Sequence, residues 1–188
     1  DVGRGNALFM HLTLVPYIAS AHELKTKPTQ HSVRDLRSIG IQPDVLLCRT
    51  DRQLDQDMKR KIALFCDVDE EAVITALDVP SIYEVPLSLA SEGVDRILLD
   101  RLHLPQTEAK MDAWTDLVER VHHPHDEVTI HFVGKYVEYE DSYKSINEAL
   151  YHGGFKHRLK VNLKFVEAEA LEQPDGHHLL DDAVGILV

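Results

Sequence analysis

The stretch Glu23-Leu24-Lys25-Thr26-Lys27-Pro28-Thr29-Gln30-His31-Ser32 lies between an apolar run and a segment with helical periodicity. Pro28 has a φ near the helical value and biases Lys27 towards an extended backbone, so Lys25 and Lys27 should point the same way. A helix that begins at Pro28 or Thr29 leaves its first N–H groups unpaired and directed towards these lysines. Such a site suits a polyphosphate. The alternative is a solvated loop with two surface lysines.

Apolar runs and helical patterns alternate along residues 7–75. The expected strands are Ala7 to Val15, Asp44 to Arg49 and Ala72 to Thr75, and the expected helices run from about Thr29 to Ser38 and from Asp55 to Cys66. This alternation predicts an α/β fold with a parallel sheet, in which the first run is a buried strand. Ligands bind beyond the carboxyl ends of such strands. We therefore expect Lys25, Lys27, Arg49 and Asp78 to share one cleft.

The strand and helix pattern restarts after a proline-bearing segment. Helices are expected at Val85 to Glu92, Val94 to Leu102, Lys110 to Val121 and Ser142 to Tyr151, and strands at Val128 to Val133, Leu159 to Val166 and Asp182 to Val188. Gly153-Gly154 should stop the helix that precedes it. A new βαβ unit predicts a second domain that starts near residue 127.

Composition limits the classes of function. The 188 residues carry a net charge of −12, with 44% hydrophobic and 28% charged residues, as in a globular protein. Residues 25–61 hold nine Lys or Arg and five Asp or Glu, so this segment alone is basic. One basic segment in an acidic chain favours a small anionic ligand over nucleic acid. No run reaches the roughly 18 apolar residues of a membrane span, and no secretory signal is visible, so we expect the cytoplasm.

Several other residues are of types that can act as nucleophiles, general bases or metal ligands. Cys48 and Cys66 lie in apolar runs and indicate buried thiols in a reducing compartment. His11 fits a satisfied core histidine better than a general base. His122-His123-Pro124-His125 suggests a metal site, but a solvated linker is the favoured interpretation because no ligand geometry or fourth ligand is indicated. No nucleophile elbow, Walker-type loop or carboxylate pair is visible. These residues and motifs alone do not identify a reaction.

The two ends of the sequence suggest a longer parent protein. The chain opens at Asp1 without a methionine and stops at Gly185-Ile186-Leu187-Val188, inside an expected strand. A natural domain seldom ends on an unpaired apolar strand.

Seven collinear blocks carry a resemblance to one family and together span essentially the whole chain. They are HLTLVPYIA at His11 to Ala19, ELKTKPTQHSV at Glu23 to Val33, SIGIQPDVLLCRTDR at Ser38 to Arg52, KIALFCDV at Lys61 to Val68, VPSIYEVP at Val79 to Pro86, VTIHFVGKYVE at Val128 to Glu138, and ALYHGGFKHR at Ala149 to Arg158. In these blocks the chain resembles CTP synthase, the glutamine-dependent ligase that aminates UTP.

The resemblance implies a domain layout and a reaction. Residues 1–105 would be the C-terminal part of the synthetase domain, which is related to P-loop dethiobiotin synthetases. Residues 106–127 would be the linker, and residues 128–188 would open a class I glutamine amidotransferase domain. In the family, ATP phosphorylates O4 of UTP, ammonia released from glutamine attacks C4, and phosphate leaves. The family also uses Mg²⁺, is inhibited by CTP, is activated by GTP, and forms homotetramers.

The resemblance also implies roles for individual residues. Those expected to hold UTP or CTP are Lys25, Thr26, Lys27, Pro28, Thr29, Gln30, Lys61 and Phe65. Lys27 would lie closest to the transferring phosphoryl group and is the expected catalytic residue. Leu77, Asp78 and Val79 would frame the adenine of ATP, and Lys135 and Lys144 would lie at the GTP-sensitive glutaminase interface.

Departures from the family pattern limit what this chain should do alone. The P-loop and Mg²⁺-binding carboxylates of the family precede Asp1, and its glutaminase catalytic residues follow Val188, so no metal ligand is assigned here. We therefore expect the fragment to form no CTP. The alternative is a non-catalytic nucleotide-binding or regulatory piece. A dethiobiotin-synthetase-like ligase is disfavoured because its chain would not continue into a second βαβ unit.

Overall fold

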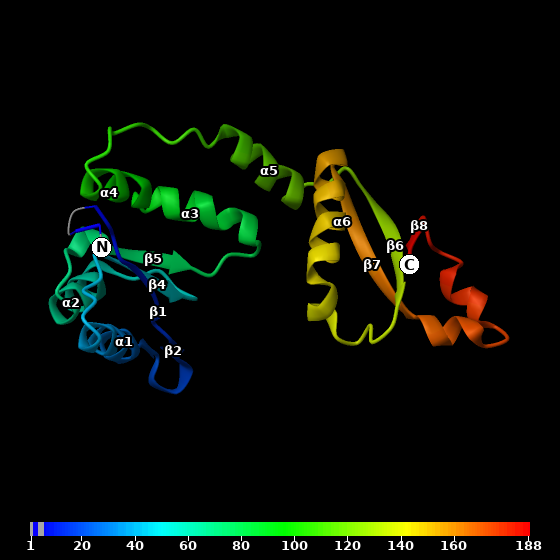
Figure 1. Cartoon of the computed structure of the whole chain (residues 1–188), viewed down its shortest axis with the longest axis horizontal. Coiled ribbons are helices and arrows are strands. Elements are labelled where there is room, and N and C mark those ends of the chain that lie inside the picture. The colour runs from blue at the N-terminus through cyan, green and yellow to red at the C-terminus, as the bar shows by residue number, and fades with distance from the viewer. Residues whose placement is uncertain (1, 4–5) are drawn as a thin grey trace. The chain divides into compact units, whose positions relative to one another are not determined.

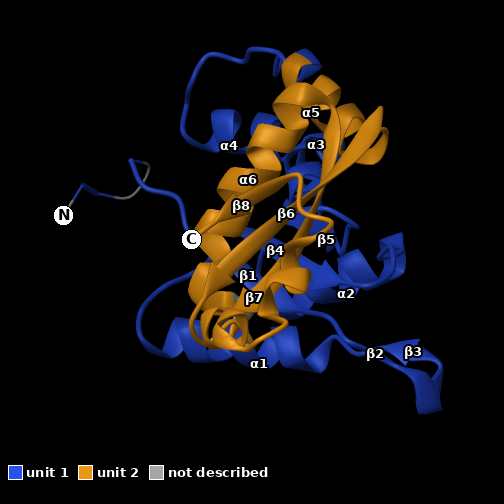
Figure 2. Cartoon of the chain, turned by 90° about the vertical axis from the view of Figure 1, so that its right-hand side faces the viewer, with its two compact units in different colours: residues 1–112 blue, residues 113–188 orange. Residues whose placement is uncertain are grey.

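The computed structural model describes residues 2–3 and 6–188 and divides into two compact units, residues 1–112 and 113–188 (Figure 2). Each unit contains a three-stranded sheet in which every pairing is parallel. Parallel strands need crossover connections, and helices supply them in both units. The predicted α/β class with parallel sheets is therefore confirmed.

The sheet of the first unit has the strand order β1-β4-β5. Its strands are β1 (Met10–Leu14), β4 (Val45–Thr50) and β5 (Val73–Leu77). Leu46 of the central strand lies opposite His11 on one side and Val73 on the other. All three strands lie close to their predicted positions, because each is a short apolar run between turn residues.

Helices cover both faces of this sheet. On one face α1 (Lys27–Ser38) and α2 (Gln56–Cys66) pack over the cluster that includes Leu46 and Cys48. On the other, α3 (Val85–Ser91) and α4 (Val94–Arg101) pack over the cluster that includes Val45 and Ile74 (Figure 1). Successive side chains of a strand point to opposite faces, so one apolar strand contributes to both clusters.

The expectation that the first apolar run is a buried strand is wrong. Met10, Leu12 and Leu14 are 39%, 62% and 53% exposed, whereas Thr13 and Val15 are buried. β1 is one of the two outer strands of the sheet, and in the described part of the chain it pairs only with β4. The apolar side chains packed under α3 and α4 come mainly from β4, β5 and those helices. An apolar run predicts a strand, but its burial depends on what covers it.

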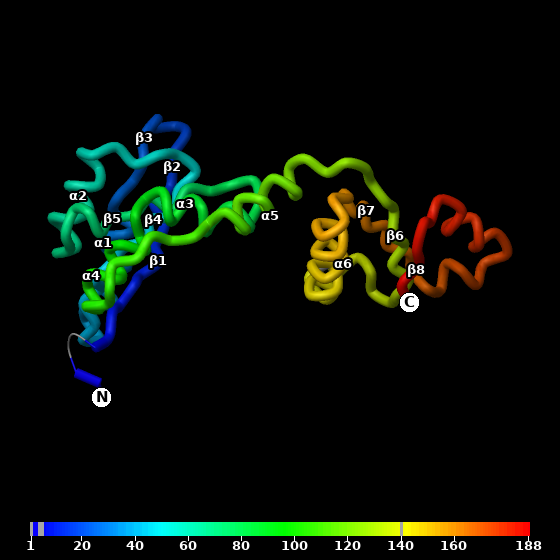
Figure 3. The backbone as a smooth tube through the Cα atoms, turned by 90° about the horizontal axis from the view of Figure 1, so that it is seen from above, coloured from blue at the N-terminus to red at the C-terminus, as the bar shows by residue number. Residues whose placement is uncertain are grey.

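A short hairpin precedes α1 and was not predicted. It consists of β2 (Tyr17–Ile18) and β3 (Glu23–Leu24), which pair antiparallel. The backbone N–H of Lys25 donates to the Pro16 carbonyl at 2.9 Å and closes the hairpin at its base. Figure 3 shows the hairpin at the end of β1 opposite the N-terminus. Strands of two residues leave no periodicity in the sequence.

The sheet of the second unit has the order β7-β6-β8. Its strands are β6 (Asp126–Gly134), β7 (Leu159–Glu167) and β8 (Gly185–Leu187), and its helices are α5 (Asp112–His122) and α6 (Lys144–His157). The three predicted strands are confirmed, although β8 is shorter than expected. The short 3₁₀ helices of the chain are Ala19–Ala21, Glu70–Ala72, Ile82–Glu84, Glu140–Tyr143, Ala168–Glu172 and Gly176–Leu180.

The prediction that Gly153-Gly154 stops a helix is wrong. α6 continues through both glycines to His157, its last residue, and Arg158, which caps the helix, has a φ of 55°. A Cβ on Gly154 would lie 2.6 Å from Cγ2 of Val161 and 2.7 Å from the Leu159 carbonyl oxygen. Gly154 therefore allows α6 to approach β7 closely, which is a packing role that local sequence signals do not reveal.

The segment assigned to the linker, residues 106–127, is only partly irregular. Residues 104–111 have no regular structure, whereas α5 belongs to the second unit. Asp116 of α5 accepts from the Arg158 guanidinium at 3.0 Å, which ties the helix to the start of β7.

No helix among the described residues is long and apolar enough to cross a membrane.

Candidate functional site

The carboxyl ends of β4 and β5 bring two of the predicted residues into contact. Nε of Arg49 lies 2.7 Å from Oδ1 of Asp78, and the Asp78 N–H donates to the Thr50 carbonyl at 2.8 Å. Both side chains of the ion pair are largely exposed to solvent. The part of the prediction that brings Arg49 and Asp78 to one edge of the sheet is confirmed, because parallel strands end at the same edge, whereas a cleft shared with Lys25 and Lys27 remains a prediction.

The backbone of the lysine stretch differs from the expectation at Lys27. α1 begins at Lys27 with Pro28 in its first turn, and Thr26 before it already has helical dihedrals. The Gln30 N–H donates to the Thr26 carbonyl at 3.1 Å and closes the first turn. Lys27 is therefore helical, and the argument that Lys25 and Lys27 point the same way because both lie in an extended segment is wrong. The preference of residues before proline is only statistical, and the first turn of the helix overrides it.

Three polar side chains of this stretch are engaged within the protein. The fully buried Thr29 hydroxyl donates to the Leu14 carbonyl at 3.1 Å and accepts from the Thr13 hydroxyl at 3.2 Å. The Gln30 side-chain amide donates to the Thr26 hydroxyl at 3.2 Å. These bonds anchor the start of α1 to the end of β1. They hold the loop in place, and Thr29 has no polar side-chain atom facing solvent.

Pro28 contributes to a shallow depression beside this anchor. The depression is lined by Leu12, Leu14, Pro28 and Arg49, together with the polar side chains of Thr13 and Ser32. Pro28 is exposed there, and so is Lys27, which precedes it in the chain. β1, the start of α1 and the end of β4 thus border one solvent-accessible depression, to which Arg49 contributes a cationic side chain.

A carboxylate connects two of the predicted lysines. Glu23 of β3 accepts a hydrogen bond from the Lys25 ammonium. The pKa of Glu23 is lowered, chiefly by this bond and charge, and Lys61 of α2 lowers it further. The Lys61 effect is a charge effect only and is smaller than that of Lys25. We name Lys25, Lys27 and Lys61, the three lysines expected to hold the nucleotide, the lysine cluster.

Phe65 lies on α2, which also carries Lys61, and the three residues expected to frame adenine lie at the end of β5. Phe65 lies one turn after Lys61 on α2 and is 58% exposed. Leu77 ends β5, and Asp78 and Val79 follow it. An exposed aromatic ring on the helix that carries a cation offers a surface on which a base can stack. Their predicted roles are compatible with these positions and remain predictions.

The hairpin is held beside the loop that follows β4. The Arg52 guanidinium carbon lies 3.3 Å from the ring centroid of Tyr17. Such a cation–π contact joins two segments that are far apart in the sequence. It places the β2–β3 hairpin, which carries Glu23, next to the carboxyl edge of the sheet.

Lys135 and Lys144 lie in the second unit. Lys135 follows β6, Lys144 opens α6, and both side chains are exposed. The Tyr143 hydroxyl donates to the Lys135 carbonyl, so the two lysines come from neighbouring ends of a strand and a helix. They share one edge of the second unit, and their proposed role at an interface remains a prediction.

The two cysteines, His11 and the three histidines of residues 122–125 are the other candidates for chemistry that the sequence offered. Burial raises the pKa of the Cys48 thiol to about 12 and that of Cys66 to about 11, so both are poor nucleophiles at neutral pH. The prediction of two buried free thiols is confirmed. His11 is half-buried and shares a hydrogen bond of 2.8 Å with the Ser32 hydroxyl. His122, His123 and His125 are exposed, and the described residues include no group of three or more ligands that could hold a metal.

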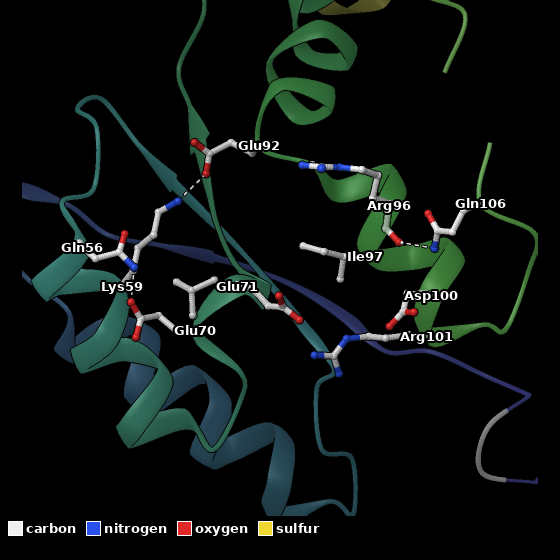
Figure 4. Close-up of a pocket in the computed structure, with 12 residues that line it drawn as sticks. Gln56, Lys59, Glu70, Glu71, Glu92, Arg96, Ile97, Asp100, Arg101 and Gln106 are labelled. Atoms are coloured by element: carbon white, nitrogen blue, oxygen red, sulfur yellow. Dashed lines mark hydrogen bonds and ion pairs between the residues drawn. The ribbon is translucent and has the colours of Figure 1, made fainter. Parts of the chain in front are cut away.

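A second, larger cavity lies beside β5 and away from the lysine cluster. Figure 4 shows charged side chains of α2, α4 and the turn before β5 around it. Lys59 bonds to Glu92 at 2.6 Å, and Arg101 bonds to Asp69 at 2.6 Å, so two of its three cations are neutralised. Paired charges of both signs give this cavity no clear preference for an anion.

Sequence reasoning missed Glu23 and the contact between Tyr17 and Arg52. The pairing of Glu23 with Lys25 could have been predicted from the sequence, because the two residues are two apart and such side chains share a face of an extended segment. No sequence signal predicts the contact between Tyr17 and Arg52, since the two residues meet only when β1, β4 and the hairpin are assembled.

Comparison with known proteins identifies relatives along the whole chain. Residues 1–104 match the family model described as the CTP synthase N-terminus. A CTP synthase of Koribacter versatilis is 61% identical over all of this chain and 34% of its own length, and one of Acidobacterium capsulatum is 59% identical with the same coverage. One of Methanocaldococcus jannaschii is 54% identical over 96% of this chain and 34% of its own length. The chain thus spans about a third of the length of these relatives.

Proposed function

The chain belongs to the CTP synthase family, and from this premise we propose that it forms part of the nucleotide site of an enzyme that aminates UTP to CTP. The product makes this a step of pyrimidine nucleotide biosynthesis. The observation that supports the proposal most directly is the contact of Lys25, a member of the lysine cluster, with the Glu23 carboxylate, whose pKa the charge of Lys61 also lowers. Fixed cations are what a triphosphate and a moving phosphoryl group require.

The proposed layout assigns residues 1–105 to the C-terminal part of the synthetase domain and residues 128–188 to the start of a glutamine amidotransferase domain, with residues 106–127 between them. The division of the chain after residue 112 and the end of the family match at residue 104 support a boundary in this region. The parallel βαβ unit of residues 126–167 is compatible with the opening of a second α/β domain.

In the proposed mechanism, ATP phosphorylates O4 of UTP, ammonia attacks C4, and phosphate leaves. Lys25 and Lys61 hold the triphosphate of UTP, or of the inhibitor CTP, and the Lys27 ammonium neutralises charge on the transferring phosphoryl group. Thr26, Thr29 and Gln30 keep the loop in position through their internal hydrogen bonds, and Pro28 contributes to the depression at its surface. Phe65 packs near the base.

Other family features are proposed on the same premise. Leu77, Asp78 and Val79 border the ATP adenine, and Lys135 and Lys144 contribute to the interface at which GTP activates the use of glutamine. The homotetramer and the cytoplasmic setting are proposals of the same kind. Mg²⁺ accompanies ATP in the family, and the proposal assigns no residue of this chain as its ligand.

The function can be tested in a grafted enzyme. The 188 residues replace the corresponding segment of the Koribacter versatilis relative, which matches all of this chain over 34% of the relative's own length. We expect Lys27→Ala to lower the rate of CTP formation by about 100-fold or more, since removal of one group that stabilises transition-state charge typically has that effect. Arg34→Ala, on the exposed side of α1, is the matched control and should stay within about twofold of the parent rate, because exposed ion pairs contribute little.

Two outcomes would contradict the proposal. One is a Lys27→Ala graft with the parent turnover and the parent affinity for UTP. The other is CTP made by the isolated 188-residue chain from ATP, UTP and ammonia, which the proposal excludes. Binding of UTP by a graft that forms no CTP would favour the alternative, a nucleotide-binding piece without catalysis.

A further inference from the structure

The anion-binding group of Lys25 already has an anionic partner within the chain. The Glu23 carboxylate accepts from its ammonium, and the two side chains are 53% and 42% exposed. Neither Lys27 nor Lys61 has an ion pair recorded among residues 2–3 and 6–188. One cation of the lysine cluster is thus neutralised at the place where the proposed function requires a phosphate.

The hairpin backbone brings the two side chains together. Glu23 lies opposite Ile18 in the β2–β3 ladder, and Lys25, two residues further along, donates through its backbone N–H to the Pro16 carbonyl. Residues two apart on such a backbone extend their side chains to the same face. The contact between Arg52 and the Tyr17 ring fastens the hairpin to the first unit. The carboxylate is therefore held beside the cluster by the fold.

Nearby acidic residues have other partners. Asp78 pairs with Arg49, and Glu92 pairs with Lys59. Glu23 is the carboxylate whose pKa is lowered by two members of the lysine cluster. Any phosphate that contacts Lys25 must compete with it.

We propose that Glu23 is an internal counter-ion of the nucleotide site, which occupies Lys25 in the empty protein and is displaced by the triphosphate of UTP or CTP. This inference rests on the proposed function and names a residue that sets the affinity of that site. Displacement needs only a rotation of an exposed side chain, because Glu23 packs against no buried cluster. A triphosphate carries several negative charges, whereas the carboxylate carries one, so the triphosphate displaces Glu23 from Lys25. The competition from Glu23 nevertheless lowers the affinity of the site for the triphosphate.

The size of the effect follows from Coulomb's law. One unit charge at about 4 Å in water changes an equilibrium by about fivefold, and a partly shielded site increases the factor. Removal of the Glu23 charge should therefore tighten binding of a triphosphate by about fivefold to tenfold at low ionic strength. The gain should shrink in salt, because exposed charges are screened.

The experiment measures the dissociation constants of UTP and CTP by calorimetry for the 188-residue chain and for the grafted enzyme. Glu23→Gln is the test variant, and Asp35→Asn is the control, which removes the same charge from an exposed pair with Arg34 on α1. Circular dichroism confirms that each variant is folded. We expect about fivefold to tenfold tighter binding for Glu23→Gln in 20 mM salt, less than about twofold in 0.5 M salt, and less than about twofold for Asp35→Asn at either concentration.

The outcomes separate the two proposals. Unchanged or weaker binding by Glu23→Gln, in a protein where Lys25→Ala weakens binding, overturns the counter-ion role and leaves the nucleotide site intact. Equal tightening by Asp35→Asn also overturns it, because the effect would then come from net charge alone. If the unsubstituted protein binds neither nucleotide in either context, the proposed function fails, and the counter-ion role fails with it.

Discussion

Lys59 and Glu92 form an ion pair that is largely shielded from water. Their side chains are 17% and 18% exposed, and Nζ lies 2.6 Å from Oε2 (Figure 4). Glu92 also accepts from the Thr75 N–H at 3.0 Å and from the Gln53 amide at 3.1 Å. Burial alone would raise the pKa of Glu92, but the hydrogen bonds from Lys59 and Thr75 outweigh it, and the pKa is lowered. One carboxylate thus joins α2, β5 and the loop after β4.

We expect Glu92→Gln to destabilise the protein by about 2 kcal/mol at pH 7, because it leaves the shielded Lys59 without its counter-ion. A group with a lowered pKa contributes stability above its unfolded value and loses that contribution as the pH falls through the folded value. The difference between the parent and Glu92→Gln should therefore be constant above the ordinary pKa of 4.5 and shrink below it. Urea unfolding at pH 7 and at successively lower pH measures it.

Asp57→Asn is the matched control for this prediction. Asp57 pairs with Arg60 one turn away on α2, and its side chain is 92% exposed. The change should cost less than about 0.5 kcal/mol at any pH. Equal losses for the two variants, or a Glu92→Gln effect that grows in acid, would contradict the role given to Glu92.

At the scale of the element, the two adjacent glycines of α6 have different roles. A Cβ on Gly154 would meet Val161 and the Leu159 carbonyl at less than 3.0 Å, whereas a Cβ on Gly153 would meet nothing within 4 Å. Both residues are helical, so both suffer the same low helix propensity. Only tertiary packing distinguishes them.

Substitution of each glycine by alanine tests this difference. Gly154→Ala should lower the free energy of unfolding by about 1–3 kcal/mol, since the added methyl group forces α6 away from β7. Gly153→Ala should raise it by up to about 1 kcal/mol, because alanine is the better helix former and the site is open. Thermal and urea unfolding provide the measurement. A stabilising Gly154→Ala would show that the close approach of helix and strand is not required.

Elements were predictable where local pattern and tertiary environment agree. The strands around Leu46, Ile74 and Phe132 follow from short apolar runs, and α1 follows from its proline start and periodic apolar residues. The hairpin of β2 and β3 was not predictable from the sequence, because two-residue strands form only when neighbouring segments hold them. The helical conformation of Lys27 was not predictable either, since the first turn of α1 overrides the extended preference of a residue before proline.

At the scale of the molecule, two compact units are joined through residues that lack regular structure. Residues 104–111 form neither helix nor strand, and Glu108 and Lys110 are exposed. Limited trypsin digestion should therefore cut first after Lys110, because proteases need an extended, accessible backbone. Mass spectrometry of the early products should give residues 1–110 and 111–188.

Lys110→Gln should remove that first cut, whereas Lys156→Gln, within α6, should leave the early pattern unchanged. A first cut inside a helix or strand would show that the division into two units does not describe the least protected part of the chain.

The sequence by itself determined the α/β class, the three parallel-sheet strands of each unit and the lysine stretch at the start of a helix, since these depend on local periodicity and on residues close together in the chain. The tertiary structure alone decided that β1 is an exposed outer strand, that Gly154 is a packing residue, and that the hairpin carrying Glu23 and Lys25 lies beside Arg52. Burial, close approach and charge pairing arise between segments distant in sequence, and only the assembled fold brings those segments together.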